Sequence, residues 1–128
     1  MTTVQFIVDG LSPQAKGSKT LRKTKDGRQF LAEAAPKLKP WMRMIIKEAA
    51  AMQTEVGTLD GPLMVIAEFR FPIAQARRGL RRCWKTSAPD LDRLVRALGD
   101  ALTQSKLSHD DARSCALNAW TVETDQWP

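Results

Sequence analysis

The stretch PDLDRLVRALGDAL, residues 89–102, carries the strongest structural signal in the chain. Asp90 follows a proline and precedes apolar residues at helical spacing, so we expect it to be the N-cap of a helix. One face of this helix is apolar and consists of Leu91, Leu94, Val95, Leu98 and Leu102. Asp92 lies in the first turn, where the helix dipole favours negative charge. The stretch therefore predicts an amphipathic helix that begins with two carboxylates.

Five of the 14 acidic residues lie in this stretch and in the turn that follows it, SHDD at residues 108–111. Like charges close together repel unless a cation neutralises them. Asp90 and Asp92 are near enough to bind one cation, whereas Asp100 lies about 12 Å beyond Asp92 by helical rise. Carboxylates alone favour Mg²⁺ or Mn²⁺ over zinc. Acids at a cap are also ordinary helix chemistry, so spacing alone leaves both a metal site and a structural pair open.

These residues resemble, in order and spacing, the signature of RusA-type Holliday junction resolvases, which are common in phages and prophages. The signature consists of a Pro-Asp-Leu-Asp-Asn-Leu segment, a Lys, an Asp-Ala-Leu and an Asp-Asp-Ala. The corresponding positions here are residues 89–94, Arg96, residues 100–102 and residues 110–112, and no gap is needed. The apolar segments nearer the N-terminus also fall where the family has strands, so the resemblance spans most of the chain.

The resemblance implies specific roles for the matched residues. It makes three carboxylates catalytic and metal binding: Asp90, Asp92 and Asp111. Two further acids of the motifs, Asp100 and Asp110, would support them. Arg96 takes the place of the essential lysine of the family, and Arg93 replaces the asparagine. Arginine keeps the positive charge but differs from lysine in geometry and in proton transfer.

The resemblance also implies a substrate and an assembly. The substrate would be branched DNA, such as a four-way junction, cut by paired nicks in DNA recombination and repair. A homodimer is implied because a four-way junction has two-fold symmetry and resolution needs two matched nicks, which an isologous dimer supplies. The implied cofactor is Mg²⁺ or Mn²⁺.

Length and charge agree with a nucleic-acid-binding protein. The 128 residues fit a single domain, 1–128, with a net charge of +6. Residues 1–89 hold 16 Lys and Arg against 7 Asp and Glu, whereas residues 90–128 hold 4 against 7. A basic surface beside an acidic cluster suits a protein that grips phosphates, although a basic protein without such a role has the same composition.

The sequence also gives an expectation for the cellular location of the protein. We expect no signal peptide and no membrane span, and therefore a location in the cytoplasm of a bacterium or a phage-infected host cell. Cys83 and Cys115 are then expected to be free thiols.

The order of predicted elements indicates an α/β (α+β) fold, one mixed β-sheet packed by two main helices. The elements are a strand at residues 3–8, a basic hairpin or loop at 19–31, a helix at 40–52, a strand at 63–71, a basic loop at 72–88, the helix after Asp90 and a strand at 114–124. The unbroken apolar run in the 63–71 strand predicts burial on both faces.

Basic residues before the acidic helix are the candidates for binding DNA phosphates. They are Lys16, Lys19, Arg77, Arg78, Arg81, Arg82 and Lys85. Trp84 lies among them and could stack on an unpaired base or pack inside the protein. His109 could act as a base only with a positioned partner, and a lone loop histidine is more often neither ligand nor base.

Two other classes of function remain open. A non-catalytic DNA-binding protein could keep this fold, and the arginines at positions 93 and 96 favour that alternative. A phosphatase or glycosyltransferase could use an Asp-x-Asp pair, but such pairs usually end an apolar strand. Here Asp90 follows the polar segment Lys85-Thr86-Ser87, which counts against that class.

Overall fold

The computed structural model describes residues 2–15, 19–33, 36–77 and 79–125. Two α-helices, five strands and two short 3-10 helices form within these ranges. They are β1 (Lys19–Lys23), β2 (Gln29–Glu33), α1 (Leu38–Val56), β3 (Leu63–Pro72), η1 (Gln75–Arg77), β4 (Arg82–Trp84), α2 (Leu91–Gln104), η2 (Asp111–Arg113) and β5 (Ser114–Thr124). No helix in the described ranges is both long and apolar enough to cross a membrane.

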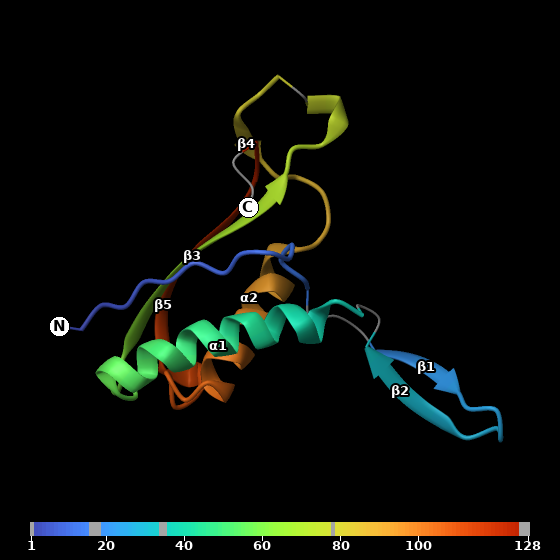
Figure 1. Ribbon diagram of the computed structural model, residues 1–128, viewed down its shortest axis with the longest axis horizontal. Helices are drawn as coiled ribbons and strands as arrows, with labels where there is room; N and C mark the ends of the chain where they lie inside the picture. Colours follow the sequence, from blue (N-terminus) through green and yellow to red (C-terminus); the bar gives the residue numbers. More distant parts are fainter. Residues whose placement is uncertain (1, 16–18, 34–35, 78, 126–128) are drawn as a thin grey trace.

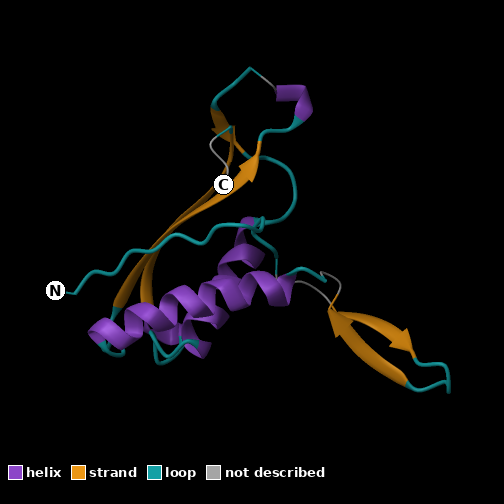
Figure 2. Ribbon diagram, in the orientation of Figure 1, coloured by secondary structure: helices purple, strands orange, loops and turns teal. Residues whose placement is uncertain are grey.

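The main sheet has three strands, with β5 in the centre. Figure 2 shows strands in orange and helices in purple. The long strand β3 runs parallel to β5, from the pair Leu63–Ser114 to the pair Pro72–Thr124. The short strand β4 is antiparallel to β5 on its other side. A mixed sheet with two helices confirms the predicted α+β class.

Both helices pack on one face of this sheet. Trp41 of α1 contacts Phe69 of β3, with 6.3 Å between the ring centroids. α2 contributes Leu94, Ala97 and Ala101 to the same core. The small alanines allow the helices to approach closely, and Leu94 fills the space between them and the sheet. The apolar periodicity of residues 89–102 therefore positions α2, and with it the acidic residues at its start.

The opposite face of β3 is open, which corrects the prediction of burial on both faces. Met64 and Ile66 are 70% and 63% exposed. Their neighbours Val65 and Ala67 point to the helix side and are half-buried. Burial on both faces requires covering elements on both sides, as in doubly wound folds, and the helices described here cover only one.

The predicted strand at residues 3–8 is wrong, because residues 2–9 form no strand in the structure. Phe6 and Val8 nevertheless pack against the core, while Ile7 between them is exposed. Side chains that are alternately buried and exposed indicate an extended segment with one face on the core, but such a segment is a strand only if a neighbouring strand hydrogen bonds to it. The segment thus keeps the burial pattern of a strand without pairing as one.

The basic segment at residues 19–31 forms the hairpin, one of the two predicted alternatives. β1 and β2 pair antiparallel from Lys19–Glu33 to Lys23–Gln29. In the turn, the Gly27 amide donates to the Thr24 carbonyl at 3.0 Å, and Gly27 has a φ of 89°, which favours glycine. Figure 1 shows the hairpin extending away from the helices and the main sheet.

Candidate functional site

The two acids of the central motif lie at the start of α2. Asp90 is the N-cap, with extended backbone angles, and its carbonyl accepts a hydrogen bond from the Leu94 amide at 3.2 Å. The predicted N-cap position is confirmed, but the Asp90 side chain makes no capping hydrogen bond. Asp92 follows in the first turn, and both residues are exposed. Both carboxylates are therefore displayed at the positive end of a fourteen-residue helix.

The second acidic pair lies beside this helix. The Asp110 carbonyl accepts hydrogen bonds from the Ser108 hydroxyl at 3.0 Å and from the Arg113 amide at 3.2 Å, and these bonds fix the turn into η2. η2 begins at Asp111 and lies against α2. The Asp111 side chain lies outside what the structure describes, so its convergence with Asp90 and Asp92 stays a prediction.

The chemistry of the described donors fits a hard cation. No group of three or more His, Cys, Asp or Glu suited to a metal occurs among the described side chains, a set that does not contain Asp111. Asp90 and Asp92 contribute exposed carboxylate oxygens in the same helical turn, and no described side chain forms an ion pair with either. Uncommitted carboxylates of this kind are the ligands that Mg²⁺ prefers.

The arginines of α2 lie at its surface. Arg93 and Arg96 are both exposed on α2. Arg96 lies one turn from both Asp92 and Asp100 on α2, so a surface pair with one of these acids stays the alternative to a catalytic role. Asp100 is half-buried and lines a hollow with Leu38 and Met42 of α1, two turns beyond Asp92. The supporting role of Asp100 stays a prediction.

His109 has a partner that the sequence did not indicate. Its Nε2 lies 2.5 Å from Oδ1 of Asp60, in the connection between α1 and β3. The two connections also meet through the Leu59 amide, which donates to the Leu107 carbonyl at 2.8 Å. The segment Asp60-Gly61-Pro62 is typical of a turn, but the contact with His109 depends on the parallel pairing of β3 and β5, which brings the two connections together.

A buried carboxylate anchors the basic segment between β3 and α2. Glu123 is buried on β5 and accepts hydrogen bonds from Arg77 Nε at 2.6 Å and Nη2 at 2.8 Å. The Cys83 thiol donates to the same carboxylate at 3.5 Å. The hydrogen bonds from Arg77 lower the pKa of Glu123, against the raising effect of burial. Arg77 is thus engaged within the protein, and its predicted phosphate contact stays untested.

A second carboxylate holds two arginines on the open face of the sheet. Glu68 of β3 accepts hydrogen bonds from Arg70 Nε at 2.6 Å and from Trp120 Nε1 at 2.8 Å, and it also pairs with Arg82. Partial burial raises the pKa of Glu68, but the hydrogen bonds from Arg82, Trp120 and Arg70 outweigh it and lower the pKa to about 2. Glu68 therefore stays ionised, and one negative charge is shared between two positive ones.

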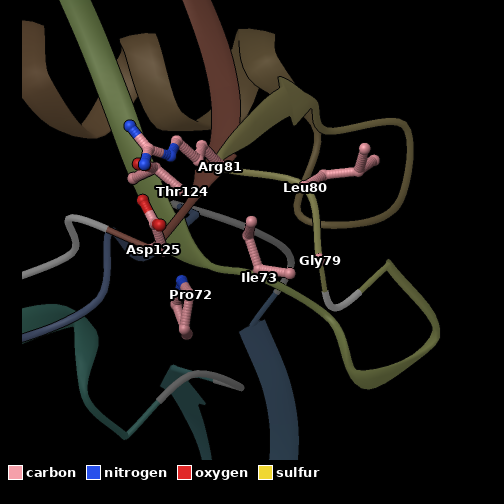
Figure 3. A pocket seen from close by; sticks show the side chains of 7 residues that line it. All are labelled: Pro72, Ile73, Gly79, Leu80, Arg81, Thr124 and Asp125. Atoms are coloured by element: carbon pink, nitrogen blue, oxygen red, sulfur yellow. The ribbon is translucent and has the colours of Figure 1, made fainter.

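The remaining candidates for binding phosphate differ in whether other groups of the protein contact their side chains. Lys85 lies over the Phe71 ring, 4.6 Å from its centroid, and also hydrogen bonds to Ser87. The exposed Arg81 borders an open pocket of about 490 Å³ (Figure 3). The other lining residues are Pro72, Ile73, Gly79, Leu80, Thr124 and Asp125. The candidate side chains of Lys16, Lys19 and Arg78 lie outside the described residues.

The basic segment is more ordered than the predicted loop at residues 72–88. It contains η1 and the strand β4. β4 pairs with β5 from Arg82–Thr124 to Trp84–Val122. The segment therefore presents its side chains from a sheet edge, and the chain continues through the loop at residues 85–90 into the acidic end of α2.

Comparison with known proteins covers most of the chain. The model of a family described as endodeoxyribonuclease RusA matches residues 11–128. The crossover junction endodeoxyribonuclease rusA of Lactococcus phage r1t is 35% identical over 65 residues, which are 51% of this chain and 48% of that protein. The chain thus spans about half the length of the curated relative it matches.

Proposed function

The chain belongs to the RusA endodeoxyribonuclease family, and on this premise we propose that it is a metal-dependent endonuclease that resolves four-way junctions or other branched DNA by paired nicks. One observation carries the proposal. The ungapped acidic motif of the family begins α2, where Asp90 and Asp92 are exposed and have no protein partner among the described residues. Carboxylates kept free at the positive end of a helix are suited to hold a cation.

Asp90, Asp92 and Asp111 would hold Mg²⁺ or Mn²⁺. When bound, the ion supplies charge neutralisation at the phosphate and activation of a water molecule. The exposed guanidinium of Arg96, one turn after Asp92, stabilises negative charge that develops on the phosphate oxygens. Because arginine keeps its proton under ordinary conditions, Arg96 acts by its charge and does not serve as a proton donor.

The basic residues position the substrate. Arg81 and Arg82 lie at the edge strand β4 or next to it, in the segment that leads to Asp90. Contacts to backbone phosphates fix the register of DNA on a protein without reading its sequence. A homodimer would present two acidic sites to the two-fold symmetric junction. Activity in recombination and repair, in the cytoplasm of a bacterium or phage-infected cell, follows from this substrate.

Nicking of a synthetic four-way junction in Mg²⁺, compared with EDTA and with a linear duplex of the same arms, tests the proposal. We expect nicks in the junction that require Mg²⁺ and occur on opposed strands. The second candidate, a non-catalytic DNA-binding protein, is favoured by the arginines at positions 93 and 96. It predicts tight junction binding with no nicks under any metal condition, a result that would refute the enzymatic proposal.

A further inference from the structure

Trp84 is much more exposed to solvent than tryptophan residues usually are. Its side chain is 70% exposed, whereas Trp41 is buried and Trp120 is half-buried. Tryptophan is large and apolar, and most of its area is ordinarily removed from water. Of the two alternatives that the sequence left open, a packing role inside this chain is therefore wrong.

The backbone around Trp84 is held firmly. On one side, the Cys83 thiol donates to the buried Glu123 at 3.5 Å. On the other, the Lys85 amide donates to the Thr121 carbonyl at 3.2 Å, and the Thr121 hydroxyl donates back to the Lys85 carbonyl at 3.2 Å. The indole consequently extends from a fixed sheet edge, and little conformational entropy is lost when it contacts a partner.

The charges next to Trp84 suit an anionic partner. Arg82 lies two residues before it, on the same face of β4. Arg82 shares the Glu68 carboxylate with Arg70, so the three side chains together keep one net positive charge. The preceding residue, Arg81, is a further exposed cation. An aromatic ring among cations is the combination that binds single-stranded nucleic acid, because bases stack on the ring while phosphates meet the cations.

The position of Trp84 along the chain links it to the acidic site. Five residues lie between Trp84 and Asp90, so their Cα atoms are at most about 22 Å apart. That span corresponds to roughly six base pairs, at about 3.4 Å per nucleotide along one strand. A base contacted by Trp84 would thus lie within about six nucleotides of the phosphate at the acidic end of α2.

We propose that the Trp84 indole stacks on an unpaired base at the branch point of the DNA substrate, with Arg82 and Arg81 contacting the adjoining phosphates. The inference rests on the proposed function and adds a source of selectivity for branched over linear DNA. Bases in a linear duplex are already stacked and paired, whereas a branch point offers bases that can be unstacked at lower cost. Trp84 therefore favours branched over linear DNA.

The test measures binding in EDTA, where the proposed enzyme does not cut. Binding of a four-way junction and of a linear duplex is compared for wild type, Trp84→Phe, Trp84→Ala and the control Leu117→Ala, which removes an exposed apolar side chain from β5. Trp84→Ala should weaken junction binding about tenfold or more, the scale of one lost stacking contact. It should change duplex binding less than twofold. Trp84→Phe should keep most of the affinity, and Leu117→Ala should match wild type.

A fluorescent base analogue at the branch point supplies a readout that a purely structural role of Trp84 would not change. Stacking on the indole should quench 2-aminopurine in wild type and leave it bright in Trp84→Ala. Equal losses on junction and duplex, or unchanged binding with a loss of self-association in sedimentation, would overturn the inference. Wild-type protein that shows this quenching and selectivity but never nicks DNA in Mg²⁺ would instead refute only the proposed endonuclease activity.

Discussion

Leu94 holds the acidic helix in place, and its truncation should be among the most damaging single changes in α2. The side chain is fully buried in the core shared by α1, α2 and β3. Leu94→Ala removes about 2.4 kcal/mol of transfer free energy at about 0.8 kcal/mol per methylene-sized group. The cavity left behind raises the total loss to about 3–5 kcal/mol. For 128 residues, a loss of about 3 kcal/mol should lower the Tm by about 10 °C.

Leu91→Ala is the matched control, because it makes the same chemical change one turn earlier on the same helix. Leu91 is 37% exposed, so its truncation removes less buried area and leaves no closed cavity. Thermal unfolding followed by far-UV circular dichroism should show at most half the Tm decrease of Leu94→Ala. Equal decreases for the two variants, or a decrease below about 3 °C for Leu94→Ala, would contradict the packing of α2 described above.

Three further predictions concern the charged groups. Mg²⁺ should raise the Tm of the wild-type protein, because the ion binds the folded state, and Asp92→Asn should lose most of that increase; an equal increase in both proteins would remove Asp92 from the site. If Arg96 acts by charge alone, Arg96→Lys should nick at about the wild-type rate and Arg96→Ala about a hundredfold more slowly or worse; a wild-type rate in Arg96→Ala would make Arg96 an ordinary surface residue. Glu68 has a pKa of about 2 in the folded protein against a usual value of 4.5, so its contribution to the free energy of unfolding is complete above about pH 4.5 and is lost as the pH falls toward 2. Urea unfolding between these pH values should show a smaller loss of stability in Glu68→Gln than in wild type. Parallel curves for the two proteins would refute the ion pairs assigned to Glu68.

Elements set by local periodicity could be predicted from the sequence. The helix after Asp90 and the strands at residues 63–71 and 114–124 were found because each apolar pattern extends over several turns or strand repeats. The structure confirms all three, with small differences in their ends. Asp90 was also identified as the N-cap, since capping depends on the few residues that surround it.

Features that depend on distant partners could not be predicted. The buried Glu123 pairs with Arg77, 46 residues away, and nothing near either residue indicates the pair. The short strand β4 exists because β5 offers it an edge, whereas its own sequence is basic and gives no strand alternation. Residues 3–8 show the reverse case, since they are rich in β-branched and aromatic residues, but no strand in the described part of the chain pairs with them. Pairing in a sheet is a tertiary property that local propensity does not determine.

The most direct test of the central claim is the single-turnover rate of junction nicking for wild type, Asp90→Asn and Glu55→Gln at saturating protein and Mg²⁺. Glu55→Gln is the matched control, because it removes the same charge from an exposed position near the end of α1. If Asp90 holds the ion, Asp90→Asn should nick at least a hundredfold more slowly than wild type. It should bind the junction as tightly or more tightly, because a negative charge near phosphate is removed, and Glu55→Gln should nick at the wild-type rate. Nicking by Asp90→Asn at the rate of Glu55→Gln would contradict the claim that the acidic end of α2 is the catalytic site.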